Sequence, residues 1–249
     1  MQVLVNEAYI EQKKKLGRYG TIAGLTLLGV GFAISLLEQT QAVDVPGLGP
    51  VPVILISYIL LFPGLVLFNI GRVNAIRWGI RPREDEILTA SLKGLDGRFH
   101  LYHFMPQVPR VEHFMIGPGG IVIFQVRHHM GEIHVAGDRW WRKPSFGAFI
   151  RGMAEGALGN PARDAERDEE DLRAYLAQQA GAELAEKVPV EAIAVFVNPR
   201  VQLVIESEPT IPVRLPRDVK TFVRQNIGPR TADRLTQDEL NQLWAAFEA

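Results

Sequence analysis

Two long apolar segments dominate the first third of the chain. Residues Tyr19–Leu37 contain no charged side chain, and neither do residues Val45–Gly71. An α-helix needs about 20 apolar residues to cross the hydrocarbon core of a bilayer. The stretch between the segments, Glu38–Asp44, is short and has an acidic residue at each end. This pattern predicts a hairpin of two transmembrane helices, with the lipid bilayer as its partner.

Basic residues flank the predicted hairpin on its outer sides only. The link between the segments has no lysine or arginine, whereas both outer flanks are rich in them: Lys13, Lys14, Lys15 and Arg18 before, and Arg72, Arg77, Arg81 and Arg83 after. The positive-inside rule therefore predicts that both termini and the main domain are cytoplasmic. The expected organisation is a cytoplasmic segment 1–18, the hairpin 19–71, a basic juxtamembrane linker 72–83 and a domain 84–249.

The apolar segments fit a signal peptide or a soluble core less well than a hairpin. A cleaved signal peptide would leave the second segment unexplained, and no small-x-small cleavage site ends the first segment. Helices in the core of a soluble domain would be expected to show a polar face, and neither segment has one.

Beyond residue 83 the pattern changes to short elements of alternating type, which is typical of an α/β domain. Acidic residues open a helix at Glu84, where they favour the helix dipole. Asn160 and Pro161 suit a helix cap and first turn, and Thr236 and Glu239 form a capping box. We expect helices from Glu84, from Asn160, over 216–224 and from Thr236, and strands over 99–105, 133–136, 139–142, 191–197 and 201–205.

The central feature of this domain is a predicted strand–loop–strand over Val111–Arg127. Two apolar, β-branched runs flank the loop sequence Gly-Pro-Gly-Gly at residues 117–120. If these four residues form the loop, Ile116 faces Ile121 and the pairing continues outward. Extending that register places Glu112 across from Gln125, and Arg127 on the same face as Gln125. Three polar residues at one end of an apolar hairpin predict either a site or a solvated end of the sheet.

This stretch resembles the nuclease-related domain family, NERD, a branch of the PD-(D/E)xK nuclease superfamily. The family pattern is Asp-His, an apolar strand, Gly-Pro-x-Gly, a second apolar strand, Glu-x-Lys and then a glycine. Here Glu112-His113 stands at Asp-His, Gly117–Gly120 matches the loop, Gln125-Val126-Arg127 stands at Glu-x-Lys, and Gly131 follows. The resemblance extends weakly over about Arg83 to Arg224. It implies a restriction-endonuclease-like fold, with a mixed central sheet flanked by helices.

The resemblance also implies a site for Mg²⁺, which the family's two carboxylates hold while the lysine positions or activates water. All three positions depart from the pattern in this chain. Glu112 keeps the charge but is one methylene longer, Gln125 offers only a neutral oxygen, and Arg127 cannot lose a proton near neutral pH. These changes predict that metal-dependent cleavage is weak or lost.

Two further family features are matched less closely. The first helix of these domains carries a glutamate, for which Glu86 is the nearest match, although it could equally be a helix-start acid. The family's Asn-Pro-x-x-Gln becomes Asn160-Pro161-x-x-Asp164 here. The acidic residues that follow Asp164 are most simply the solvated side of a helix.

Two further groups of polar residues are candidate sites. Arg139, Arg142, Lys143 and Arg151 could bind phosphate groups of DNA or RNA, or could form a charged edge in solvent. All six histidines lie between His100 and His134, which indicates either a metal site or, more simply, polar histidines scattered over the faces of the sheet. On strand alternation, however, His113 and Glu112 point to opposite faces, so that only His129 could join Glu112 as a ligand.

Composition narrows the choice of function only a little. The chain of 249 residues has no cysteine, which excludes disulfides and thiolate metal sites, and its net charge of −1 gives no sign of a nucleic-acid partner. The first hypothesis is a membrane-anchored domain with a degenerate nuclease site that binds nucleic acid or a protein. The second is an active metal-dependent nuclease tethered to the membrane. A transporter has little support, because the hairpin has no embedded charge.

Overall fold

The computed structural model describes residues 1–39, 50–143, 157–228 and 235–248. The chain divides into two compact units, each of which is described by itself. One unit is helical and comprises Glu7–Arg83, and the other combines Met1–Asn6 with Glu84–Ala249. Residues 40–44 of the expected interhelical link lie outside the described residues.

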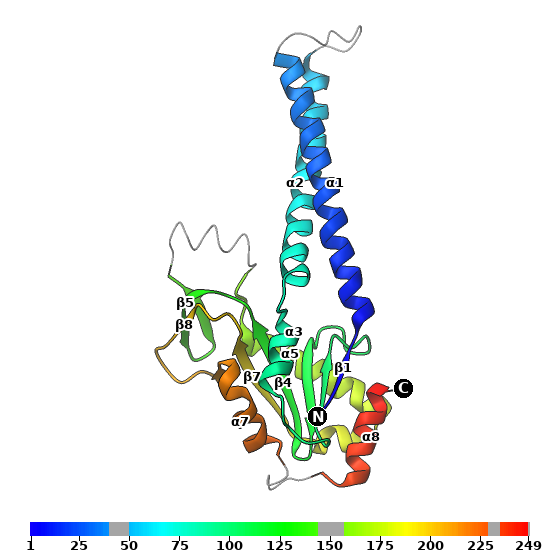
Figure 1. Cartoon of the computed structure of the whole chain (residues 1–249), viewed down its shortest axis with the longest axis vertical. Helices are drawn as coiled ribbons and strands as arrows, with labels where there is room; N and C mark the ends of the chain where they lie inside the picture. The colour runs from blue at the N-terminus through cyan, green and yellow to red at the C-terminus, as the bar shows by residue number, and fades with distance from the viewer. Residues whose placement is uncertain (40–49, 144–156, 229–234, 249) are drawn as a thin grey trace. The chain divides into compact units, whose positions relative to one another are not determined.

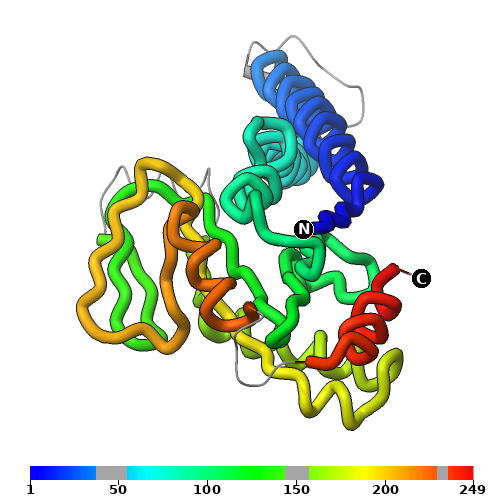
Figure 2. Tube along the Cα trace, turned by 60° about the horizontal axis from the view of Figure 1, so that its bottom comes forward, coloured from blue at the N-terminus to red at the C-terminus, as the bar shows by residue number. Residues whose placement is uncertain are grey.

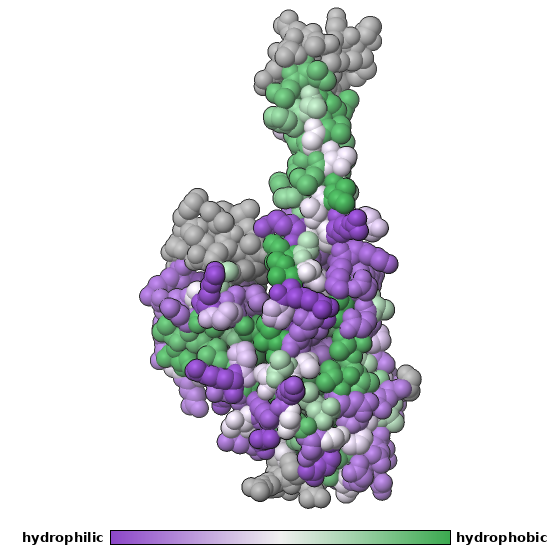
Figure 3. All heavy atoms as spheres, viewed as in Figure 1, coloured by the Kyte–Doolittle hydropathy of each residue, from purple (hydrophilic) through white to green (hydrophobic). Residues whose placement is uncertain are grey.

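The helical unit consists of α1 (Glu7–Gln39) and α2 (Pro50–Gly79) (Figure 1). The first apolar segment lies within α1, and residues 50–71 of the second lie within α2, as expected. Residues 45–49 of the second segment lie outside the described residues. Each helix is long and apolar enough to span a membrane, and only 11% of each apolar window is buried within the protein. Figure 3 shows apolar side chains gathered on the surface of both helices.

Glycines bring α1 and α2 into close contact. A Cβ on Gly20 would lie 3.1 Å from the Cα of Gly71, and one on Gly24 would lie 2.3 Å from the backbone nitrogen of Phe68. Gly20 and Gly24 therefore permit the close approach of the two helices. A Cβ on Gly29, by contrast, would meet nothing within 4 Å.

The other unit is built on a six-stranded mixed sheet. Its spatial order is β1 (Gln2–Val5), β2 (His100–His103), β3 (His113–Gly117), β4 (Gly120–Arg127), β7 (Val190–Phe196) and β9 (Val213–Arg214). Strands β2, β3 and β4 form an antiparallel meander, and β1, β7 and β9 pair in parallel with their neighbours. The mixed central sheet is as expected, but β1 was not predicted.

A smaller sheet has the order β6 (Arg139–Arg142), β5 (Gly131–Ala136) and β8 (Val201–Ile205). Strands β5 and β6 are antiparallel and pair Ala136 with Arg139 across a turn at Gly137-Asp138, so the two strands expected over 133–136 and 139–142 form a hairpin. Strands β5 and β8 are far apart in sequence but run side by side in parallel (Figure 2).

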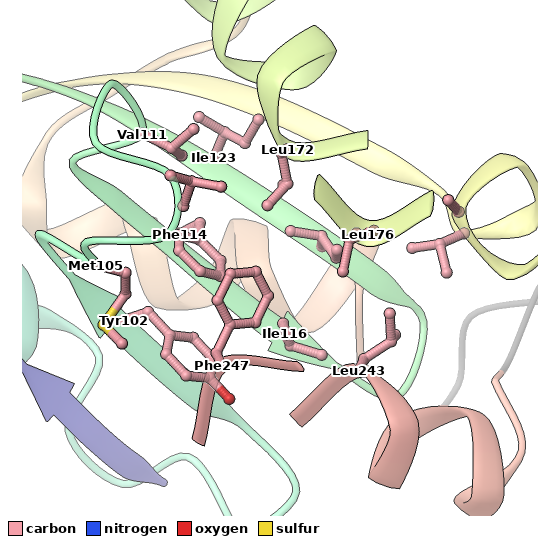
Figure 4. Packing of buried hydrophobic residues seen from close by; sticks show 14 of the residues in the cluster. Tyr102, Met105, Val111, Phe114, Ile116, Ile123, Leu172, Leu176, Leu243 and Phe247 are labelled. Carbon is pink, nitrogen blue, oxygen red and sulfur yellow. The ribbon is translucent and has the colours of Figure 1, made fainter. Parts of the chain in front are cut away.

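Helices cover both faces of the large sheet. Helices α5 (Pro161–Gln179), α6 (Ala182–Lys187) and α8 (Gln237–Glu248) pack on one face, and α3 (Glu84–Ser91) and α7 (Pro216–Asn226) pack on the other. On the α5 side, the ring of Phe114 stacks against Tyr102 at 4.8 Å and contacts Phe247 of α8 (Figure 4). The strand that carries Phe114 is thus packed against α8.

The expected helix starts are also observed. The backbone nitrogen of Glu239 donates to Oγ1 of Thr236 at 3.3 Å, and the Glu239 carboxylate accepts from the backbone nitrogen of Thr236 at 2.7 Å. This is the reciprocal pattern of a capping box. The domain is therefore an α/β fold in which a mixed sheet is flanked by helices, consistent with a nuclease-like domain.

Candidate functional site

The β3–β4 hairpin positions the candidate site. Ile116 pairs with Ile121, which is the predicted register, and Gly117 pairs with Gly120 across the loop. Gly120 has a φ of +134°, and a Cβ there would lie 2.3 Å from the backbone oxygen of Pro189. The hairpin therefore needs glycine at residue 120, both for its backbone conformation and for the space.

Glu112 lies just before β3, outside the paired register. The last described pair of the hairpin is Phe114 with Ile123, so the expected cross-strand pair of Glu112 and Gln125 lies beyond the ladder. The backbone oxygen of Glu112 accepts a hydrogen bond from the backbone nitrogen of Phe104 at 2.8 Å. Glu112 is thus held through its backbone at the end of the strand, where strand alternation no longer determines the direction of its side chain.

The side chains of Gln125 and Arg127 both contact helix α5. Gln125 is only 5% exposed, and its Nε2 donates a hydrogen bond to Oδ2 of Asp168 at 2.6 Å. Arg127 donates through Nη2 to Oδ2 of Asp164 at 2.5 Å. Two residues along a strand advance about 6.7 Å and four along a helix advance about 6 Å, so the two pairs fit side by side.

The first turn of α5 is fixed by its cap. Oδ1 of Asn160 accepts hydrogen bonds from the backbone nitrogens of Ala162 and Arg163 at 3.0 and 3.2 Å, as the sequence predicted. The amide of Asn160 also donates to the backbone oxygen of Asp138 at 2.8 Å. Because the cap joins α5 to the turn between β5 and β6, it fixes the helix end that carries Asp164.

Asp168 is an acid with an unusual environment. The pKa of its carboxyl is raised to about 7, chiefly by burial. The negative charges of Asp164 and Glu112 add to the rise, and the Gln125 hydrogen bond and Arg127 oppose it. Because the charge of Glu112 contributes to this shift, Glu112 acts electrostatically on the Asp168 carboxyl. The site therefore contains a carboxyl that titrates near neutral pH.

A second group of side chains, Glu84, Glu112 and His113, could hold a metal ion. One ligand atom from each of them lies within 4.8 Å of the others. The expectation that Glu112 and His113 diverge to opposite faces is therefore wrong. It relied on strand alternation, which does not apply because Glu112 precedes β3.

The ring of His113 contacts the ring of a second histidine, His103. Its Nδ1 lies 2.8 Å from Nδ1 of His103, and Nε2 of His103 lies 3.0 Å from Oγ1 of Thr89 on α3. His103 and His113 are 0% and 1% exposed, so the two rings are fixed inside the domain.

The basic residues of β6 form a separate surface. The guanidinium of Arg139 lies over the ring of Trp141 at 5.8 Å, and Nζ of Lys143 lies 2.8 Å from Oε1 of Glu132. Arg142 is half-buried on the same strand, and Arg151 lies outside the described residues. The three described basic side chains are close in sequence, but none of them belongs to the group around Glu112.

The comparison with protein families identifies the domain. Residues 83–197 match the model of NERD, the nuclease-related domain. This chain carries a NERD domain. The match begins where the resemblance was expected to begin and ends before Arg224, the expected limit. Neither the curated proteins nor the solved structures give a significant match to the chain.

Within the NERD domain, the three family-aligned residues remain candidates for the site. Gln125 and Arg127 form hydrogen bonds with neighbouring acids of α5, and the charge of Glu112 contributes to the raised pKa of Asp168. Among the described residues, Glu86 is not part of the group that could hold a metal ion. Glu84, in the same helical turn, belongs to that group instead.

Sequence reasoning missed Glu84 and Asp168. Glu84 is one of three acids in the first turn of α3, and nothing in a single sequence distinguishes the one that faces Glu112. Asp168 belongs to the acidic run of α5 that was expected to be solvated, but its side chain contacts Gln125. A usable signal was its position four residues after Asp164, because that spacing places both acids on one helix face.

Proposed function

We propose that the protein is a membrane-anchored NERD domain that binds nucleic acid without hydrolysing it. The observation that carries the proposal is that helix α5 engages both altered positions of β4. Gln125 donates to Asp168 at 2.6 Å, and Arg127 donates to Asp164 at 2.5 Å. The two groups that would serve a hydrolytic centre are thereby used in contacts within the domain.

The chemistry of these residues also argues against hydrolysis with Mg²⁺. This ion prefers anionic oxygen ligands in a tight octahedron. The side chain of Gln125 carries no charge, and its Nε2 is used to donate a hydrogen bond to Asp168. Arg127 can stabilise a phosphate, but it stays protonated and cannot take a proton from water. The domain therefore retains an anion-binding group without a base at that position.

One observation favours the alternative, an active metal-dependent nuclease. Asp168 places a carboxylate beside Gln125, at the position where the family has a glutamate. In this alternative, a carboxylate from α5 replaces the missing one on β4. Even with that replacement, Arg127 stays in its ion pair with Asp164, and position 127 has no lysine to activate water. We therefore prefer the non-hydrolytic interpretation.

The helical unit supports anchoring in a lipid bilayer. Large apolar side chains along both helices are exposed, among them Phe32 at 60% and Phe62 at 72%. Hydrocarbon would cover these surfaces at no cost to the helix backbone, whose hydrogen bonds are internal. With the basic flanks on the outer sides of the hairpin, we propose that both termini and the NERD domain are cytoplasmic.

The first testable prediction concerns this topology. A reporter that is active only in the cytoplasm should be active when fused after Ala249, and a reporter that is active only outside should be silent there. Insertion of the same reporters within residues 40–49 should give the opposite pattern. Activity of the external reporter at the C-terminus would overturn the orientation.

Strand β6 supports the binding of nucleic acid. It lies at the edge of the smaller sheet and carries Arg139, Arg142 and the neighbouring Lys143, with the half-exposed ring of Trp141 among them. Cationic groups that alternate with aromatic rings are typical of surfaces that bind single strands, because they combine phosphate contacts with base stacking. Glu132 neutralises part of this charge through Lys143, which limits the expected affinity.

The second prediction tests this surface by charge reversal. The double variant Arg139→Glu, Lys143→Glu should bind labelled single-stranded DNA or RNA about tenfold more weakly than wild type in fluorescence anisotropy. Its salt dependence should also be shallower, by roughly one to two in the slope of log K against log salt. Arg217→Glu, at an arginine whose side chain is 80% exposed on α7, serves as the control.

The outcomes of this binding experiment are distinct. Equal loss in the Arg217→Glu control would show that only the overall charge matters. If wild type binds neither DNA nor RNA, the nucleic-acid part of the proposal is wrong, and a protein partner at the membrane becomes the remaining binding role.

A further inference from the structure

We infer that Glu84, Glu112 and His113 form a site for a divalent first-row transition-metal ion, such as Mn²⁺ or Zn²⁺, in preference to Mg²⁺. This goes beyond the proposed function, because it requires neither nucleic-acid binding nor hydrolysis. It also differs from the family expectation, in which carboxylates alone hold Mg²⁺. Three features carry it: the convergence of the donor atoms, the support of the histidine, and the chemical type of the donors.

The donor atoms converge from two elements of the domain. Glu84 is the first residue of α3, Glu112 directly precedes β3, and His113 is the first residue of β3. One ligand atom of each residue lies within 4.8 Å of those of the other two. Three ligands spread evenly at about 2.1 Å from one ion lie at most about 3.6 Å from one another. Binding would thus need the donor atoms to approach by about 1 Å, which side-chain rotation can supply with no rearrangement of the strands.

The burial of the three residues suits a bound ion. His113 is buried, and both glutamates are half-buried. The histidine is therefore fixed in place, while the carboxylates keep contact with solvent, through which an ion can enter and retain water ligands. Two carboxylates also match the charge of a divalent ion, so that binding leaves no net charge among the three donors.

The buried contacts of His113 determine which nitrogen would bind the ion. Nδ1 of His113 lies 2.8 Å from Nδ1 of His103, so Nε2 is the nitrogen that would coordinate. Coordination requires a neutral ring with its proton on Nδ1, and that proton can be donated only if Nδ1 of His103 accepts it. The proton of His103 is then on Nε2, which lies 3.0 Å from the Thr89 hydroxyl oxygen.

This chain of contacts has the form that metal-binding histidines usually need. A ligating histidine almost always donates its other N–H to a partner, which fixes its tautomer and ring orientation. Here His103 takes that role, and Thr89 fixes His103 in turn. The arrangement therefore explains why two histidines are buried in direct contact beside two acidic side chains.

The donor set selects the class of metal. Imidazole nitrogen suits Zn²⁺ and related ions, and carboxylate oxygen suits Mn²⁺, which binds N/O ligand sets as a first-row transition metal. Mg²⁺ prefers oxygen ligands alone and gives up its water reluctantly. The second carboxylate position of the family is the neutral Gln125, whose amide donates to Asp168. The residues present therefore do not fit the carboxylate site for Mg²⁺ that the family implies, and they fit a mixed nitrogen–oxygen site.

The test is metal binding by the full chain in detergent micelles, after treatment with a chelator. Isothermal titration with Mn²⁺, Zn²⁺ and Mg²⁺ should show one site per chain that binds Mn²⁺ and Zn²⁺ at least tenfold more tightly than Mg²⁺. Co²⁺ should produce visible absorption bands on binding. Glu84→Gln and His113→Gln should each weaken Mn²⁺ binding at least tenfold and change the Co²⁺ spectrum, whereas the matched control Glu86→Gln should do neither.

A further variant separates metal binding from folding. Thr89→Val removes the hydroxyl that contacts His103 without touching a ligand, and it should weaken Mn²⁺ binding about tenfold. Glu84 is half-buried, so its variant is expected to fold even if the His113 variant does not. Equal affinity for Mg²⁺ and Mn²⁺, unchanged affinity in Glu84→Gln, or no binding of any of the three ions would each overturn the inference.

Discussion

Replacement of Gly120 by alanine is expected to destabilise the NERD domain by about 3 kcal/mol or more. The backbone at this residue has a φ of +134°, and a Cβ would lie 2.3 Å from the backbone oxygen of Pro189. Backbone strain of this kind costs of order 1–3 kcal/mol for a residue other than glycine. The contact adds to that cost, because the backbone oxygen of Pro189, just before β7, cannot rotate away as a side chain can.

Urea unfolding of the full chain in detergent can measure this effect through tryptophan fluorescence and circular dichroism. Gly97→Ala is the matched control, because a Cβ at Gly97 would meet nothing within 4 Å. The control is expected to change stability by less than about 0.5 kcal/mol. A Gly120→Ala variant as stable as the control would show that the close approach of the loop to Pro189 is wrong.

The second large effect is expected at Asp168, and it depends on pH. Burial raises the pKa of this carboxyl in the folded domain to about 7, whereas an aspartate in the unfolded chain has a pKa of about 3.9. Between these values the folded state holds a proton that the unfolded state has lost. The free energy of unfolding therefore falls as the pH rises from about 4 to 7, and the penalty is fully present above pH 7.

Asp168→Asn should remove this penalty, because asparagine stays neutral and its amide oxygen can still accept from Gln125. The variant should match wild type near pH 4 and should be more stable by on the order of 2 kcal/mol at pH 8. The full pKa difference corresponds to about 4 kcal/mol, which we reduce by half because the side chain is partly exposed.

Unfolding of both proteins at several pH values gives this difference directly, and contributions from other groups cancel. Glu166→Gln on the exposed side of α5 should stay within about 0.5 kcal/mol of wild type. If Asp168→Asn is instead less stable at pH 8, the Asp168 carboxylate makes a favourable interaction in the folded domain, which would support the nuclease alternative.

Local sequence rules predicted much of the fold. The Gly-Pro-Gly-Gly loop determined the register of β3 and β4, since Ile116 pairs with Ile121 as expected. Asn160 and Thr236 predicted two helix starts, because capping depends on residues only two or three positions away. The uncharged segments predicted α1 and α2 for the same reason, as length and polarity are local properties.

The features that were missed depend on contacts between distant segments. Strand β1 has only four residues, and it pairs with β2 nearly a hundred residues later. Which of the acids in α3 would face Glu112 depends on how the helix packs on the sheet. The partner of His113 was wrongly excluded, because the alternation rule was extended to Glu112, one residue beyond the end of β3.

Two of the departures from the family pattern are in direct contact in the folded domain. Relative to that pattern, arginine replaces lysine at residue 127 and aspartate replaces glutamine at residue 164. In the folded domain these two residues form an ion pair with an N–O distance of 2.5 Å. The changes are therefore compatible with one another, and they connect the strand and the helix that enclose the candidate site.

The absence of hydrolysis is tested most directly by a cleavage assay on the full chain in detergent. Labelled single- and double-stranded DNA and RNA are incubated with wild type and with Glu112→Ala, in the presence of Mg²⁺, Mn²⁺ or Zn²⁺. Wild type is expected to cleave no substrate above the Glu112→Ala background. The variant Glu112→Asp, Gln125→Glu, Arg127→Lys is expected to bind Mg²⁺ more strongly, because it restores the two family carboxylates. Robust cleavage by wild type that Glu112→Ala abolishes would contradict the proposal and make this protein a nuclease.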